Sequence, residues 1–156
     1  MTFEELYRRY FADVHRFALY LTGNPAEAED IASETFARAW AADAPLRAQR
    51  LDAYLFSIAR NLHRRGYRRR RLDALAADMP DAPPGPEREL AGRGELAATL
   101  AQLQALPEVD RAALLMRAFH ELSYDEIAAA LGLSVSSAKV KVHRARTALK
   151  AHRSQS

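Results

Sequence analysis

The sequence contains no cysteine, few glycines and no long apolar run. Without cysteine the chain forms no disulfide and binds no metal through thiolates, as expected of a protein in the reducing cytosol. Six glycines among 156 residues, together with abundant alanine, favour helices. No apolar stretch approaches the roughly 20 residues that a membrane-spanning helix needs, and the charged start MTFEELYRRY lacks the apolar core of a secretory signal. We therefore expect a cytoplasmic, all-α protein without membrane insertion.

Negative charge is missing from the end of the chain. No Asp or Glu follows Glu126. The cations in that final segment are Lys139, Lys141, Arg144, Arg146, Lys150 and Arg153. A surface with charge of one sign suits a polyanionic partner.

The segment from Leu122 to Leu149 predicts a helix-turn-helix. Ser123 can cap a short helix, and Gly132 ends that helix where the chain must turn. The helix that follows has a narrow apolar stripe. The rest of its surface is basic or able to form hydrogen bonds, through Ser136, Ser137, Lys139, Lys141, His143, Arg144 and Arg146. Such a second helix is typical of proteins that read a DNA major groove.

Three further helices are predicted in the first half of the chain. Thr2 and Glu5 form a capping box for the first helix, and Gly23 ends it. Asn24 caps the second helix, which runs to about Ala42. The third begins near Asp52, and its polar face mixes aromatic residues with cations: Tyr54, Phe56, Arg60, Asn61, His63, Arg64, Tyr67 and Arg68. Aromatic rings stack on unpaired bases and arginines neutralise phosphates, as single-strand binding requires. The alternative is a core helix with a solvated arginine tail.

Prolines and glycines concentrate between the two halves. The segment 76–94, AADMPDAPPGPERELAGRG, is predicted to be a flexible linker. It divides the chain into two small helical domains, residues 1–75 and residues 95–156. A linker of this kind permits the domains to be either apart or clasped together.

Three motifs in this order resemble a known family. They are EDIASETFARAW, then LDAYLFSIARNLHRRGYRR, then, after the linker, LPEVDRAALLMRAFHELSYDEIAAALGLSVSSAKVKVHRARTAL. The combination is similar to bacterial RNA polymerase sigma factors of the sigma-70 family, specifically the extracytoplasmic-function (ECF) subfamily, which keeps regions 2 and 4. The resemblance implies binding to core RNA polymerase through the beta-prime clamp helices and the beta flap. It also implies promoter DNA and an anti-sigma factor as partners, no cofactor or metal, and no enzymatic activity.

The resemblance also assigns residues to the two domains. Core polymerase binding falls on Asp30, Glu34 and Arg38. Melting and reading of the minus-ten element fall on Tyr54, Arg60, Asn61, Arg64, Arg65 and Arg68. The loop from Asp43 to Leu51 is expected to shape the base pocket together with Asn61. This loop carries Pro45 and Leu46 where many relatives have an aromatic residue.

The minus-thirty-five element is assigned to the second helix of the helix-turn-helix. The residues implied are Ser136, Ser137, Lys139, Val140, Lys141, His143, Arg144 and Arg146. Lys139 and Arg144 are expected to donate to guanine, and Lys141 and Arg146 to phosphates. Val140 either touches a thymine methyl group or helps the helix to pack.

Two other functions compete with this interpretation. A stand-alone DNA-binding regulator explains the helix-turn-helix equally well, but it does not explain the aromatic, arginine-rich third helix. An enzyme acting on nucleic acid finds no support, because the sequence has no phosphate-binding loop, no zinc-ligand spacing and no cysteine nucleophile.

Overall fold

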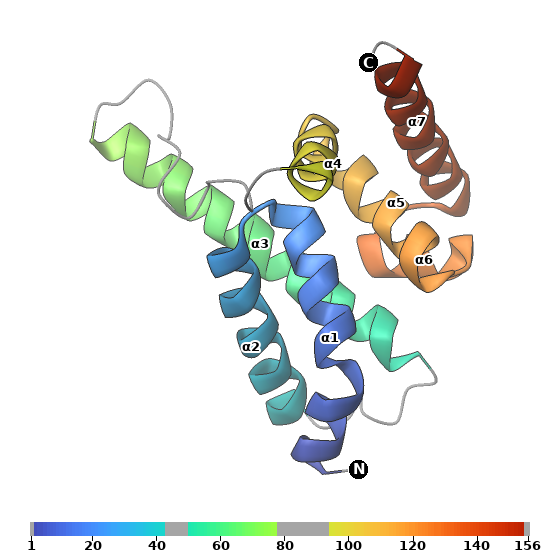
Figure 1. Cartoon of the computed structure of the whole chain (residues 1–156). Helices are drawn as coiled ribbons and strands as arrows, with labels where there is room; N and C mark the ends of the chain where they lie inside the picture. Colours follow the sequence, from blue (N-terminus) through green and yellow to red (C-terminus); the bar gives the residue numbers. More distant parts are fainter. Residues whose placement is uncertain (1, 43–49, 78–93, 155–156) are drawn as a thin grey trace.

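The computed structural model describes residues 2–42, 50–77 and 94–154. Across these residues the chain forms seven helices and no strand, which confirms the prediction of an all-α protein. The helices are α1 (Phe3–Thr22), α2 (Pro25–Ala42), α3 (Leu51–Ala76), α4 (Glu95–Gln104), α5 (Glu108–His120), α6 (Tyr124–Leu131) and α7 (Val135–Ser154). Figure 1 shows α1, α2 and α3 as one group, and α4 to α7 beside it.

The first group is a bundle of α1, α2 and α3 around three buried phenylalanines. Phe17 and Phe36 are fully buried on α1 and α2. Phe56 is also fully buried, and its ring centroid lies 4.7 Å from that of Phe17. The prediction that Phe56 lies on the polar face of the third helix is therefore wrong. Its ring stabilises the core instead of meeting solvent.

The turn between α1 and α2 follows the predicted capping residues. Gly23 has φ 71°, in the left-handed region, and its N–H donates to the carbonyl of Leu19. A side chain at this position would also collide with Gln104, whose Cγ lies 2.9 Å from the place of a Cβ. The Asn24 side chain then accepts a hydrogen bond of 2.8 Å from the backbone N–H of Glu27. These contacts fix the angle between α1 and α2 and leave room for α4.

The second group contains the predicted helix-turn-helix as α6 and α7. Ser123 and Glu126 form a reciprocal capping box at the start of α6, and Gly132 (φ 69°) ends the helix. Ser134 accepts a hydrogen bond of 3.1 Å from the N–H of Ser137 at the start of α7. The sequence prediction of this motif, with its cap and its glycine turn, is confirmed.

The two groups pack against each other. Helix α1 contacts α4 and α5, and α3 contacts α5 and α6. Helix α2 packs on α1 and α3, on the side that faces away from α5, α6 and α7 (Figure 1). Of the two arrangements that the linker permits, the structure has the clasped one.

Candidate nucleic-acid interface

The outward face of α7 is the first candidate surface for DNA. Ala138, Val142 and Ala145 are fully buried and hold α7 on the rest of its group. The predicted residues Ser136, Lys139, Val140, His143, Arg144 and Arg146 are exposed, and Ser137 and Lys141 are half-buried. Val140 is 52% exposed, so its methyl groups are available to a partner. The structure thus brings the predicted minus-thirty-five residues together on one basic helix.

A buried carboxylate holds Arg144. Asp110 in the first turn of α5 accepts two hydrogen bonds from the guanidinium of Arg144, at 2.9 and 3.2 Å. The side chain of Asp110 is 3% exposed and that of Arg144 is 55% exposed. The hydrogen bonds and the negative charge of Asp110 raise the pKa of Arg144. One edge of the guanidinium is therefore engaged inside the protein, while the remainder faces outward. Sequence analysis missed Asp110, because an acid in the first turn of a helix is ordinary.

Lys139 and Lys141 on the same face of α7 have different surroundings. The Lys139 ammonium lies 5.7 Å from the ring centroid of Tyr124, within the range of a cation–π contact. Lys141 donates a hydrogen bond of 3.1 Å to the hydroxyl of Ser137, one turn earlier on α7. Lys139 is the more exposed of the two. None of the ion pairs among the described residues joins the Lys139 ammonium to a carboxylate. No acid of the described residues therefore competes with a DNA base for this ammonium.

Helix α3 is the second candidate surface, and its predicted residues separate into two sets. Asn61, Arg64, Arg65 and Arg68 are exposed on its middle part. Tyr54 is half-buried where α3 meets α6. Arg60 is buried, since its side chain is 7% exposed and forms an ion pair with Glu108 of α5. Residues 43–49 of the predicted base-pocket loop lie outside the part of the chain that the structure describes.

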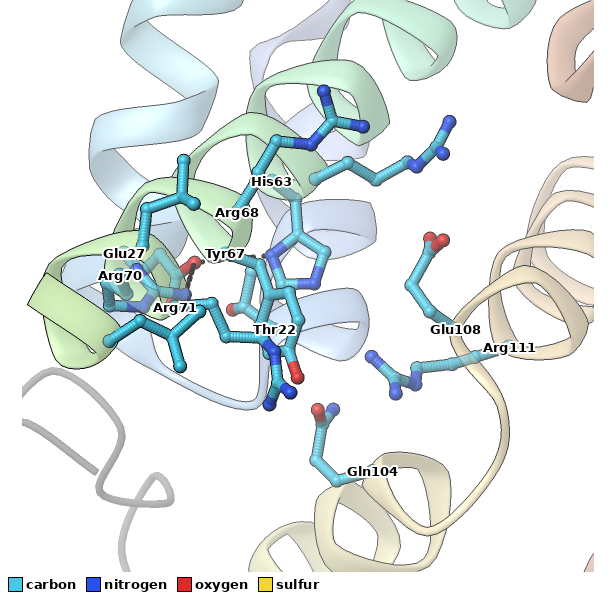
Figure 2. A pocket seen from close by; sticks show the side chains of 13 residues that line it. Thr22, Glu27, His63, Tyr67, Arg68, Arg70, Arg71, Gln104, Glu108 and Arg111 are labelled. Carbon is cyan, nitrogen blue, oxygen red and sulfur yellow. Dashed lines mark hydrogen bonds and ion pairs between the residues drawn. The ribbon is translucent and has the colours of Figure 1, made fainter. Parts of the chain in front are cut away.

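The arginines of α3 border a cleft of about 920 Å³ between α3 and the α4–α5 segment. Arg64, Arg68, Arg70 and Arg71 line it from α3. Figure 2 shows Arg111 and Gln104 facing these side chains from the opposite wall. A cleft with this many guanidinium groups attracts anions.

Two carboxylates lie within the same cleft. Glu27 is within 3.2 Å of His63 Nδ1 and 3.4 Å of Arg70 (Figure 2). Burial alone would raise the pKa of Glu27, but its hydrogen bonds to His63 and Arg70 and its electrostatic attraction to these two residues outweigh burial and lower the pKa. Glu108, the second carboxylate, is the partner of Arg60. The cleft is therefore basic, with its acids already paired.

The contact between the two groups combines ion pairs, carbonyl contacts and rings. Arg60 and Glu108 share two short hydrogen bonds, 2.8 and 2.9 Å. Arg111 donates to the carbonyl oxygens of Leu21, Leu103 and Leu106, and so ties the end of α1 to α4.

Side chains from α4 and α5 extend this contact. Gln104, the last residue of α4, donates to the carbonyls of Tyr20 and Leu21 at 3.1 and 3.3 Å. Near the end of α5, the rings of Tyr20 and Phe119 stack with centroids 5.0 Å apart. None of these pairings follows from helical periodicity, because each joins residues that are distant in the sequence.

Acidification is expected to weaken this contact through His120. The His120 ring lies 4.2 Å from that of Phe56, between centroids. Burial lowers the pKa of His120 below its ordinary value of 6.5; Asp13 and Asp52 oppose the shift, and Arg16 and Arg50 add to it. The packed structure thus favours neutral His120. The resulting stability is fully present above pH 6.5 and is lost as the pH falls through the lowered pKa.

Urea unfolding from about pH 7.5 to about pH 5.5 measures this effect. Wild-type protein and a His152→Gln control, changed at an exposed site at the end of α7, should lose stability in parallel. His120→Gln should lose less over the same range. An equal loss in all three proteins would remove His120 as the cause.

Helix α2 carries the predicted polymerase-binding residues on its free side. Asp30, Glu34 and Arg38 are all exposed. Glu34 and Arg38 form an ion pair of 2.9 Å one turn apart. The face is thus solvated and carries charges of both signs.

Neither a metal-binding cluster nor a membrane-spanning helix occurs in the described residues. The parts of the chain that the structure describes contain no group of three or more His, Asp or Glu side chains that could hold a metal ion. No helix within those parts is long and apolar enough to cross a membrane.

Comparisons with known proteins match both halves of the chain. The family model for sigma-70 region 2 matches residues 6–72, and that for sigma-70 region 4 matches residues 96–149. The ECF RNA polymerase sigma factor EcfG of Rhodopseudomonas palustris is 38% identical over 141 residues, covering 86% of this chain and 76% of the relative. The ECF RNA polymerase sigma factor SigE of Mycolicibacterium smegmatis is 34% identical over 96% of this chain, which spans 60% of the length of SigE.

Solved structures match over nearly the whole chain. The sigma factor RpoE of Bartonella quintana, in complex with the anti-sigma factor NepR, aligns with 95% of this chain and 94% of its own, at 26% identity and a TM-score of 0.81. CnrH in complex with the cytosolic domain of CnrY aligns with 98% of this chain and 88% of its own, at 29% identity and a TM-score of 0.71. The alignment with RpoE spans both helical groups of this chain.

Proposed function

The chain belongs to the ECF RNA polymerase sigma factors of the sigma-70 family, and we propose that it binds core RNA polymerase and directs it to promoters. The observation that carries this function is the presence of both DNA-reading regions, in family order, on one chain. Residues 1–75 form the region 2 domain in this proposal, residues 76–94 the linker, and residues 95–156 the region 4 domain.

Each domain has a separate task in the proposal. The exposed face of α7 enters the major groove of the minus-thirty-five element, where Lys139 and Arg144 donate to base edges and Lys141 and Arg146 to phosphates. Helix α3 binds the melted minus-ten strand, with Asn61 at a base edge and the exposed Arg64, Arg65 and Arg68 along the backbone. The α2 face with Asp30, Glu34 and Arg38 docks on the clamp helices of the beta-prime subunit.

The chain contributes no catalysis in this proposal, because the polymerase supplies the chemistry of RNA synthesis. It acts in the cytoplasm, where polymerase and promoter are found. The Bartonella RpoE and CnrH structures are complexes, with the anti-sigma factor NepR and with the cytosolic domain of CnrY. We extend the first of these pairings to this chain and propose an anti-sigma factor as a third partner.

A stand-alone regulator remains the competing function, and it is not favoured, because the region 2 match accounts for the first half of the chain. Gel shifts on promoter fragments, with and without core polymerase, separate the two. A sigma factor should give a specific shift with polymerase and little or none alone. A regulator would give the same specific shift in both samples.

Asn61→Ala is expected to impair promoter opening more than promoter binding. The Asn61 side chain is exposed on α3, and its amide can both donate to and accept from a flipped base. Permanganate reactivity of the melted region should fall about tenfold while closed-complex affinity changes less than about twofold. Ser57→Ala on the same helix is the matched control, because the Ser57 hydroxyl is already bonded to the carbonyl of Tyr54. Equal reactivity of Asn61→Ala and wild type would remove Asn61 from the site.

A further inference from the structure

Asp110 is a buried acid whose cation comes from another helix. It lies in the first turn of α5, and α5 packs on α7. Its side chain is 3% exposed, whereas that of its partner Arg144 on α7 is 55% exposed. Removing Arg144 from this pair would leave a buried charge without a partner, which is strongly destabilising. Arg144 is therefore held by the core of its own helical group while it faces outward.

The pair engages one of the two forks of the Arg144 guanidinium. Nε donates to Asp110 Oδ2 at 3.2 Å, and Nη2 donates to Oδ1 at 2.9 Å. This is the side-on fork of the planar group. Among the described residues, the guanidinium forms no other hydrogen bond. The end-on fork, made of Nη1 and the second N–H of Nη2, is thus left for a partner outside the protein.

The pair also cancels the charge of Arg144 toward DNA. Because the carboxylate of Asp110 lies within hydrogen-bond distance, a phosphate farther away meets a dipole and not a full positive charge. Lys139, Lys141 and Arg146 on the same helix form no ion pair with a carboxylate in the described parts of the chain. The attraction of α7 to DNA therefore comes from these three cations, and Arg144 adds little to it.

We propose that Asp110 is a positioning residue that makes Arg144 a reader of base identity and not an anchor for phosphates. With its side-on fork fixed, Arg144 presents the end-on fork to the O6 and N7 acceptors of one guanine in the minus-thirty-five element. An unrestrained arginine would follow the nearest phosphate, which carries no sequence information. The inference rests on the proposed function. Its specific content is that buried Asp110 sets the preference at one base pair and weakens the general attraction to DNA.

Asp110→Asn tests this division, because the amide resembles the carboxylate in shape but has no charge. Holoenzyme formed from core polymerase and this variant should bind nonspecific DNA more tightly than wild-type holoenzyme. The slope of log affinity against log salt concentration should steepen by about 0.9, which corresponds to one phosphate contact. The preference for guanine at one upstream position should fall about tenfold. Competition gel shifts of closed complexes on a promoter panel, at several salt concentrations, measure all three quantities.

Arg144→Lys separates the fork from the charge. Lysine keeps a cation beside Asp110 but has no fork, so the guanine preference should fall about tenfold while the salt slope stays that of wild type. In the Arg144→Lys background, Asp110→Asn should cause no further loss of preference, because Asp110 acts through the fork of Arg144. Asp125→Asn is the matched control, since it removes an exposed acid from the first turn of α6 and should leave the preference unchanged.

The outcomes are separable. Wild-type preference and slope in Asp110→Asn would overturn the inference and leave the sigma assignment standing. A uniform loss of affinity with an unchanged slope would overturn it too, because Asp110 would then only support the fold. If the melting temperature shows that Asp110→Asn does not fold, Arg144→Lys decides, and an unchanged preference in that variant contradicts reading by the fork. If wild-type holoenzyme prefers no promoter over nonspecific DNA, the proposed function itself fails.

Discussion

Replacing Lys139 with alanine is expected to lower transcription from promoters with the matched upstream element about tenfold, while affinity for core polymerase stays unchanged. Lys139 is exposed on α7 and lies against the ring of Tyr124. Loss of one good base contact costs about 1 to 3 kcal/mol of discrimination, and tenfold corresponds to about 1.4 kcal/mol. The measurement is run-off transcription on a promoter panel in which each upstream base pair is changed in turn. Lys139→Ala should lose the preference at one or two positions.

Lys141→Ala is the matched control for that prediction. Lys141 sits two residues away on the same helix, and its ammonium is bonded to Ser137. As a phosphate contact it should weaken all promoters to a similar extent and leave the base preferences intact. If Lys139→Ala also weakens every promoter uniformly, Lys139 positions the helix and reads no base.

The corresponding change at Arg144 needs a stability measurement beside it. Arg144→Ala should also impair the upstream element, but it leaves the buried carboxylate of Asp110 without its cation. Asp110→Asn separates the two effects, because the cation is kept and its anchor is weakened. Loss of base preference in Asp110→Asn at unchanged melting temperature would show that Asp110 aims the guanidinium.

Arg111→Ala is expected to reduce the free energy of unfolding by about 3 kcal/mol, the largest stability effect that we predict. Arg111 is buried and donates to three carbonyl oxygens, one on α1, one at the end of α4 and one, that of Leu106, between α4 and α5. Burial lowers its pKa, and the charge of Glu108 opposes that shift. Truncation removes the hydrogen bonds from a charged donor to three carbonyl oxygens and opens a cavity between the two helical groups.

Urea unfolding at neutral pH measures the loss. Arg117→Ala is the control on the same helix, since Arg117 is half-buried and donates to one carbonyl, that of Leu122, at 2.9 Å. It should cost about 1 kcal/mol. Equal losses in the two variants would contradict the role of Arg111 as the tie between the domains.

The ends of helices could be predicted wherever a single capping residue or glycine determines them. Asn24, Ser123 and Gly132 cap or end their helices as their side chains and backbone freedom require. The narrow apolar stripe of α7 likewise determined which of its residues face outward. Such signals depend on neighbours within one turn of the chain, and the sequence contains all of them.

The burial of Arg60 could not be predicted in this way. Helical spacing places Arg60 beside Phe56 and Ala59, but it does not show which other helix packs against that side of α3. The structure brings Glu108, 48 residues away, against it. From the sequence alone, an arginine in a basic stretch is predicted to be solvated. Its acidic partner, here Glu108, lies in the other helical group and is brought close only by the fold. The pairing of Asp110 with Arg144, 34 residues apart, escaped prediction for the same reason.

The most direct test of the assignment as a sigma factor is run-off transcription with bacterial core polymerase on genomic fragments from the source organism of this protein. Discrete new transcripts that depend on this protein, with two shared upstream elements at promoter spacing, are the predicted result. If the protein does not associate with core polymerase and no new transcript appears, the assignment as a sigma factor is contradicted.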